Sequence, residues 1–339
     1  MSRQRRLKAV SVQRATVDQE KTMGSIDVHT HFIPQTYLNA LADIGVTEKQ
    51  VGFPLQPWDI DARLAVMDRQ GIDTEVISLS SPSMRFWHGD DARMLTRKLN
   101  EELAAIVRDR PARFGGFATL PLPDVDGALA EIGYAFDELG LDGAVLMTNY
   151  GGTYLGNAKF APVLDELNRR GAVLFVHPTE PPESEILTQG FPAPAFEYPA
   201  DTTRTVASLI DGDTAKRCPG LKIIVSHGGG TIPFLKDRLE LLLPWKWDGD
   251  PQDGAERVTS TLDSLYYDLA IVGFPASLAA IEKTHDVSRL LTGYDLPFVP
   301  EKALEAGRKN IEAFGGFSDD DRTKISFANA QTLFPRLAG

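Results

Sequence analysis

Residues 26–34 are IDVHTHFIP, an apolar run that carries two histidines one residue apart. Positions i and i+2 of a β-strand point to the same face, so His29 and His31 are expected to project side by side. An isolated pair of this kind is as typical of two buried, hydrogen-bonded histidines as of half a metal site. The rest of the chain has to decide between these two interpretations.

Three further apolar runs end in a side chain that can bind a metal ion. Residues 173–177 are VLFVH and residues 223–227 are IIVSH, and each run ends in a histidine. Residues 290–295 are LLTGYD and end in an aspartate. Four of the six histidines in the chain therefore stand at the C-terminal ends of predicted buried strands, which favours a shared site over chance.

Strand and helix patterns alternate eight times along the sequence. Residues 91–108, for example, place leucine or isoleucine at positions 95, 99, 103 and 106, the spacing of an amphipathic helix. The expected strands are residues 26–32, 74–80, 114–120, 143–147, 172–176, 221–226, 265–269 and 289–292. This alternation predicts an α/β fold, a single (β/α)8 TIM-type barrel over residues 23–339.

The barrel prediction brings five candidate side chains together. The C-terminal ends of the strands in such a barrel gather at one face, where active sites lie. His29, His31, His177, His227 and Asp295 should converge there, and this set suits a divalent metal with an open coordination position. Zinc is the first expectation and manganese the second, because mixed nitrogen and oxygen ligands suit both.

Three segments between the predicted strands have recognisable patterns of their own. Residues 179–198 contain four prolines, at positions 181, 182, 192 and 194, and are predicted to form a long loop that walls the site. Residues 201–216 are predicted to be the next helix. Residues 47–58 are expected to form an irregular insert after the first short helix.

Composition restricts the possible partners and locations. The chain has 339 residues, 42% of them hydrophobic, and a formal net charge of -12, which disfavours nucleic acid and anionic membranes as partners. No apolar run is long enough to span a membrane. Its one cysteine, Cys218, excludes an intramolecular disulfide and zinc–thiolate chemistry.

The first 22 residues differ from the rest of the chain. They contain six lysine and arginine residues against two acidic ones. We expect residues 1–22 to be a disordered basic N-terminal extension, with Met23 as a candidate native start. The default expectation for the location is the cytoplasm.

The ordered set of motifs resembles the amidohydrolase superfamily, in the branch of aminocarboxymuconate-semialdehyde decarboxylase and the metal-dependent benzoate-type decarboxylases. The matching pieces are IDVHTHFIP (26–34), LFVHP (174–178), SHGGGTIPFLKDR (226–238), LLTGYDLPF (290–298) and ANAQTLF (328–334). Within that branch, FIPQTYL, FATLPLPD and DELNRRGAVLFVHPTEP are most similar to 6-methylsalicylate decarboxylases.

The chain departs from the resembling enzymes at two places and from binuclear members of the superfamily at a third. Asp27 stands where several hydroxybenzoate decarboxylases have glutamate, so Asp27 is either a further ligand or a partner of a ligand histidine. The carboxylate-binding arginine of the aminocarboxymuconate enzyme has no match in residues 47–58. The fourth strand ends Leu146-Met147-Thr148 without the lysine that bridges two metals in binuclear members, which favours one ion.

The resemblance implies a division of roles among the convergent residues. His29, His31, His177 and Asp295 become the metal ligands. His227 is either a further ligand or, as in the resembling decarboxylases, an acid/base; we favour acid/base because an imidazole can exchange protons near neutral pH. Asp295, or His227 acting through it, is the expected proton donor to the ring carbon.

Further residues are candidates for substrate binding. Arg85, Trp87 and His88 in one loop, with Tyr150 and Phe298, are expected around an aromatic ring, although ordinary loop packing explains each of them as well. Arg238, by similarity, reaches the site of a neighbouring subunit to hold a substrate carboxylate, which implies a homodimer. The alternative is a helix-surface arginine paired with Asp237 or Glu240.

Two functions use such a ligand set. The first is a metal-dependent, non-oxidative decarboxylase of a hydroxylated aromatic acid such as 6-methylsalicylate. The alternative is a hydrolase, of lactonase or amidase type, in which the metal activates water towards a carbonyl. They differ in whether a substrate carboxylate or a water fills the open position.

Overall fold

The computed structural model describes residues 24–47, 54–247 and 251–337. The expected basic extension, residues 1–22, and the middle of the expected insert, residues 48–53, lie outside the described residues. None of the helices in the described ranges is long and apolar enough to cross a membrane.

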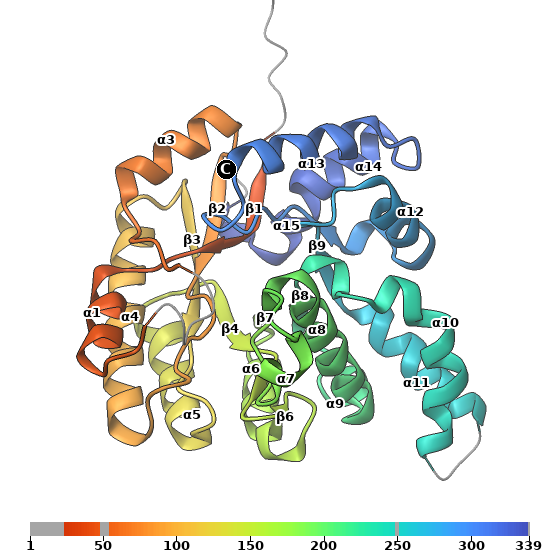
Figure 1. The fold of residues 1–339 in the computed structure, drawn as a ribbon, viewed down its shortest axis with the longest axis horizontal. Helices are drawn as coiled ribbons and strands as arrows, with labels where there is room; N and C mark the ends of the chain where they lie inside the picture. The colour runs from red at the N-terminus through yellow and green to blue at the C-terminus, as the bar shows by residue number, and fades with distance from the viewer. Residues whose placement is uncertain (1–23, 48–53, 248–250, 338–339) are drawn as a thin grey trace, which may run out of the picture.

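Eight parallel strands form the predicted barrel (Figure 1). In sheet order they are β1 (Ile26–His31), β2 (Thr74–Ser78), β3 (Phe114–Thr119), β4 (Gly143–Met147), β7 (Val173–His177), β8 (Lys222–Val225), β9 (Tyr266–Asp268) and β10 (Leu290–Leu291). Backbone hydrogen bonds from Val28 N to Thr292 O and from His31 N to Leu296 O, 3.0 and 2.8 Å long, join the last strand region to β1. The expected fold class is confirmed.

Helices surround the barrel and connect its strands (Figure 1). The longer ones are α1 (Gln35–Asp43), α3 (Ile60–Gln70), α4 (Gly89–Asp109), α5 (Val125–Gly133), α6 (Ala161–Arg169), α8 (Ala193–Asp211), α10 (Ile232–Leu242), α11 (Pro251–Ser264), α12 (Pro275–Thr284) and α13 (Glu301–Ala313). Local signals set their ends. In α3, the Asp59 side chain accepts a hydrogen bond from Ala62 N, and Gly71 closes the helix in a left-handed conformation.

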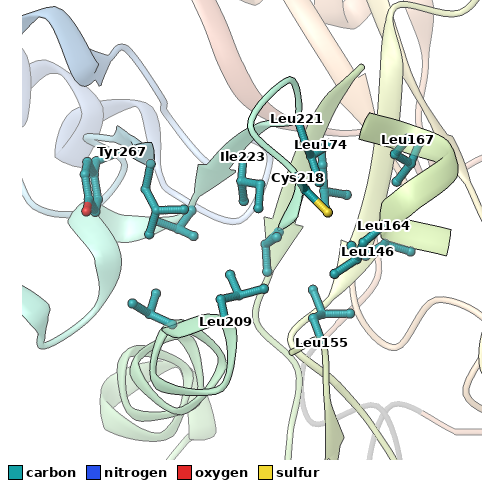
Figure 2. Close-up of a cluster of buried hydrophobic side chains, with 14 of the residues drawn as sticks. Leu146, Leu155, Leu164, Leu167, Leu174, Leu209, Cys218, Leu221, Ile223 and Tyr267 are labelled. Carbon is teal, nitrogen blue, oxygen red and sulfur yellow. The ribbon is translucent and has the colours of Figure 1, made fainter. Parts of the chain in front are cut away.

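The apolar side chains form separate layers inside and outside the barrel. Inside, Phe117 and Phe175 stack with ring centroids 5.5 Å apart, and Phe334, just after α15 (Asn329–Leu333), packs edge-on against Phe117. Outside, a second cluster fills the space between the strands and α6 and α8, and Figure 2 shows part of it. The lone cysteine, Cys218, is buried in this second cluster, which fits a packing role.

The expected long loop at residues 179–198 is partly wrong, because two helices occupy it. They are α7 (Ser184–Thr188) and the start of α8, which begins at Ala193 rather than at residue 201. Pro194 lies in the first turn of α8, where no backbone N–H is required, and Pro199 is tolerated farther inside. The helix also ends earlier than expected, at Asp211, and a separate short helix, α9 (Thr214–Arg217), follows.

Candidate metal centre and active site

Four of the predicted residues meet at the C-terminal end of the barrel. His29, His31, His177 and Asp295 each offer one ligand atom, and these atoms all lie within 4.8 Å of one another. The ring centroids of the three histidines are 4.7 to 5.3 Å apart. The histidines belong to β1 and β7, and the aspartate follows β10, so the barrel topology itself assembles the group.

Asp295 lies at the centre of the group. Its Oδ1 is 2.9 Å from His31 Nε2 and 3.4 Å from His29 Nε2, and its Oδ2 is 3.4 Å from His227 Nε2. The residue has a positive φ of 56°, and its backbone N–H donates to His29 O over 2.7 Å. That hydrogen bond ties the carboxylate to the strand that carries two of the histidines.

The donor set fits a divalent cation. His29 Nε2 is buried and makes no hydrogen bond within the described part of the chain, although Asp295 Oδ1 is only 3.4 Å away. Buried polar atoms of this kind are normally paired. Two ligand atoms about 2.1 Å from a tetrahedral zinc ion lie about 3.4 Å apart, so the observed spacing is that of atoms arranged around an ion.

Burial and mutual charge set the protonation of these groups. Burial lowers the pKa of His31, and it lowers the pKa of His177 well below the usual value, with the neighbouring histidines adding to the effect. Both rings are thus neutral and keep a lone pair for a metal. For Asp295 burial opposes ionisation, but the histidines around it, His29 foremost, hold its pKa well below the usual range.

His29 differs from the other two because two carboxylates face its ring. Burial alone would lower the pKa of His29, yet Asp268 and Asp295 together raise it to about 10. Its Nδ1 donates a hydrogen bond to Asp268 Oδ2 over 3.0 Å. The two carboxylates thus favour positive charge at this point of the centre.

His227 lies beside the four-residue group, not within it. It follows β8 with a positive φ of 56°, and Gly228, Gly229 and Gly230 continue in positive-φ conformations. Gly230 has to lack a side chain, because a Cβ there would be 2.2 Å from the carbonyl oxygen of Pro199 in α8. This tight turn leaves the His227 ring 5.0 Å from that of His29, with Nε2 directed at Asp295.

Asp27 lies in a different network, away from the ligand atoms. Its carboxylate accepts hydrogen bonds from the backbone N–H groups of His29 and Tyr294 and from the Thr30 hydroxyl. Burial, with the charge of Glu75, raises the pKa of Asp27. The structure thus places Asp27 as an anchor for the backbone on either side of the centre.

The candidate substrate-binding residues fall into two groups, and the first includes the loop after β2. The Trp87 ring packs 5.7 Å from that of Tyr37 in a buried cluster beside α1, and His88 is exposed at the start of α4. Arg85 is partly exposed, and its Nη1 lies 4.0 Å from Glu180 Oε2. The structure brings none of these three into contact with the metal-ligand group.

The second group comprises Phe298, Tyr150 and Arg238. The Phe298 ring lies 5.2 Å from that of His31, so it borders the centre. Tyr150 packs against Phe160 and accepts a hydrogen bond from Met147 N through its hydroxyl. Arg238 is exposed on α10 and forms no ion pair within the described ranges, neither with Asp237 nor with Glu240.

Two residues near the centre were missed by the sequence analysis. Asp268, at the end of β9, contacts His29 as described above, and the rule that selected strand-end histidines would have found it. Tyr198 in α8 is buried, its ring centroid is 6.4 Å from that of His177, and its hydroxyl has no hydrogen-bond partner among the described residues. It lies in the segment that was expected to wall the site.

A cavity of about 1020 Å³ lies at the opposite end of the barrel, beneath β8 and β9. Its lining includes Lys222 and Tyr266, the first residues of those strands, together with residues of α9 and α11. The histidines and Asp295 lie at the other end of the strands, so this cavity is not the candidate site.

A family model described as amidohydrolase matches residues 26–336. The chain belongs to the amidohydrolase family. Two similar curated relatives are 6-methylsalicylic acid decarboxylases. The one from Penicillium expansum is 33% identical, covering 94% of this chain and 98% of the relative. The one from Aspergillus aculeatus is 34% identical, covering 92% and 96%.

Solved structures of amidohydrolase-type barrels resemble the chain as well. A dihydroxybenzoic acid decarboxylase from Polaromonas, solved with manganese and the inhibitor 2-nitroresorcinol, is 25% identical with a TM-score of 0.77, covering 92% of this chain and 97% of that one. This amidohydrolase fold is therefore known with a divalent metal and an aromatic ligand.

Proposed function

We propose that this amidohydrolase is a metal-dependent, non-oxidative carboxy-lyase that removes CO2 from a hydroxylated aromatic acid of the 6-methylsalicylate class. The observation that carries the proposal is the buried group His29, His31, His177 and Asp295 with His227 directed at its carboxylate. The similarity to 6-methylsalicylic acid decarboxylases, 33% and 34% identical over 94% and 92% of this chain, supports this reaction over hydrolysis.

His29, His31, His177 and Asp295 would hold one divalent ion. Zinc is our first choice and manganese the second; the manganese in the related Polaromonas enzyme supports a divalent ion without deciding between them. A bound ion would supply positive charge that holds the carboxylate and ortho-hydroxyl oxygens of the substrate in one orientation. Thr148, where a bridging lysine would stand, instead donates a hydrogen bond to Asp201, which supports a single ion.

His227 and Asp295 would hold and transfer the proton that replaces the carboxylate on the ring. When the bond between the ring and the carboxylate breaks, its electron pair enters the ring, and the same ring carbon must receive a proton. The 3.4 Å contact between His227 Nε2 and Asp295 Oδ2 offers a path along which the imidazole holds a proton and passes it on. Phe298, beside His31, supplies apolar surface for the ring.

The active unit in this proposal is a homodimer. Phe234 and Leu241 of α10, with Trp245 in the following turn, are 88%, 66% and 78% exposed. They recur at helical spacing with Arg238 between them, so the helix presents an exposed apolar face that carries Arg238 and is bordered by the exposed Asp237. A second copy of the chain that covers this face would bring Arg238 towards a neighbouring site. A chain that stays monomeric while fully active, measured by sedimentation, would contradict this.

The test of the reaction uses metal-loaded protein and 6-methylsalicylate. Removal of the carboxylate as CO2 should leave 3-methylphenol, and in D2O the new ring hydrogen should be deuterium at the former carboxylate position. Salicylate analogues without the ortho-hydroxyl should react much more slowly, because they lose one oxygen that orients the ring. Release of CO2 from none of a panel of hydroxybenzoates would contradict the proposal.

The hydrolase alternative is tested with the same preparation. A lactone and an amide panel should give no turnover above the metal-free control. Rapid hydrolysis of either, together with no CO2 release from hydroxybenzoates, would replace the proposal by a water-activating function.

The expectations on partners and location stay predictions. The net charge of -12 disfavours nucleic acid and anionic membranes as partners. The expected cytoplasmic location is tested by fractionation of cells that express the native chain.

A further inference from the structure

A single carboxylate outside the ligand group contacts two parts of the centre. Asp268 ends β9 and is fully buried. Its Oδ2 accepts the hydrogen bond from His29 Nδ1 at 3.0 Å. Its Oδ1 accepts from the backbone N–H groups of His227 and Ala270, at 3.2 and 2.9 Å. Asp268 thus joins a candidate ligand to the turn that carries the candidate acid/base.

The first contact decides which nitrogen of His29 can bind a cation. A neutral imidazole carries one N–H, and an acceptor at Nδ1 keeps the hydrogen there. The lone pair then lies on Nε2, the nitrogen 3.4 Å from Asp295 Oδ1. A carboxylate partner of this kind also makes the imidazole a stronger ligand.

The second contact holds a backbone conformation that a residue other than glycine adopts at a cost. His227 has a φ of 56° and is followed by three glycines with positive φ. The hydrogen bond from His227 N to Asp268 fixes where this turn begins. The position of the ring, with Nε2 3.4 Å from Asp295 Oδ2, depends on that start.

We propose that Asp268 is a positioning residue that sets the tautomer of His29 and the place of the His227 ring. Both the affinity for the metal and the transfer of the proton then depend on one carboxylate that touches neither metal nor substrate. This inference rests on the proposed function, because it assumes that His29 is a ligand.

The backbone of Gly293 packs closely against the Asp268 carboxylate. A Cβ added at Gly293, two residues before Asp295, would lie 2.9 Å from Asp268 Oδ1 and 3.0 Å from Asp268 Cγ. The bare backbone at Gly293 therefore allows the carboxylate to reach His29 and His227 together. A methyl group there should displace Asp268 without changing its chemistry.

The first test is Asp268→Asn, measured by competition with a coloured chelator for zinc on metal-free protein. The amide places N–H groups where His29 Nδ1 now donates, which favours a hydrogen on Nε2 instead. Affinity for zinc should fall about 10- to 100-fold. The matched control is Asp263→Asn, an identical charge change at an exposed position five residues earlier, and it should leave affinity unchanged.

Turnover at saturating zinc separates the two roles. Asparagine keeps an oxygen that can accept from His227 N, whereas Asp268→Ala loses both contacts. With zinc saturating, the asparagine variant should therefore recover more turnover than the alanine variant. Equal turnover of the two variants would overturn the role towards His227.

Gly293→Ala provides a second route if Asp268→Asn does not fold. It should also weaken zinc binding by the folded protein, because the added methyl group displaces Asp268, and circular dichroism at the assay temperature serves as the control for the fold. Wild-type affinity in either folded variant overturns the role towards His29. Absence of both zinc and manganese binding by the wild type would instead refute the proposed function itself.

Discussion

Replacing His227 by asparagine removes the imidazole and keeps a side chain that tolerates the left-handed backbone at this position. The φ of 56° makes alanine a poorer choice, because asparagine visits this region several times more often than most residues. The change therefore tests the chemistry of the ring with little added strain on the turn.

The size of the expected effect follows from the place of the ring. His227 Nε2 lies 3.4 Å from Asp295 Oδ2, within reach for proton transfer, yet His227 is outside the four-residue group that would hold the ion. Loss of a positioned acid/base costs about 10²- to 10⁴-fold in rate, which is about 2.7–5.5 kcal/mol of barrier. The variant should bind one metal per chain, as we expect of the wild type.

The assay follows 3-methylphenol formation at saturating 6-methylsalicylate, with the metal content of the same samples measured by elemental analysis. Thermal unfolding of the loaded protein serves as the control for the fold. A variant that is purified without metal would reassign His227 as a ligand. A loss of turnover below about threefold, with metal retained, would refute the acid/base role.

Three further outcomes are expected. Arg63→Met should destabilise the protein by about 3–5 kcal/mol in urea unfolding, because it leaves the fully buried Glu75 carboxylate without the arginine that contacts both its oxygens. The control is Arg69→Met, which removes an exposed arginine of the same helix. An effect of Arg63→Met below about 1 kcal/mol would contradict this prediction. Tyr198→Phe should leave stability unchanged and raise KM about 2- to 10-fold if the unpartnered hydroxyl of Tyr198 bonds a substrate oxygen. The control is Tyr150→Phe, which should leave KM unchanged because the Tyr150 hydroxyl already accepts a hydrogen bond from Met147 N. An unaltered KM in Tyr198→Phe would remove Tyr198 from the site. Arg169, supported by Arg170, lowers the pKa of Glu166 from 4.5 to about 2, so the ion pairs of Glu166 stabilise the fold above pH 4.5 and lose this stabilisation as the pH falls towards 2. The difference in unfolding free energy between the wild type and Glu166→Gln should therefore shrink between pH 5 and pH 3. A difference that grows over this range would contradict the assignment.

The barrel and the ligand group could be predicted because each depends on a short, local signal. An apolar run that ends in histidine or aspartate places that side chain at the C-terminal mouth of a barrel strand, and His177 and Asp295 follow this rule from β7 and β10, three places apart in the sheet. The spacing of His29 and His31 fixes their common face without any tertiary information.

The rest depends on packing between distant segments, which local patterns do not report. Pro199 suggests a break, but burial of Tyr198 and Asp201 on the inner face of α8 holds the helix through it. Trp87 packs against Tyr37 and Tyr150 against Phe160, contacts that no local sequence pattern reports, and their role around a ring stays a prediction. Asp268 has the signal that selected Asp295, an aspartate at a strand end, but the expected strand extended to residue 269 and so placed Asp268 inside it.

Metal content and decarboxylation measured together on His177→Ala test the central claim most directly. His177 lies in the ligand group, whereas its substitution leaves the barrel strands themselves intact. The proposed function predicts that this variant folds, as judged by circular dichroism, but has lost both its divalent metal and its release of CO2 from 6-methylsalicylate. A folded variant without metal that still turns over at the wild-type rate would contradict it.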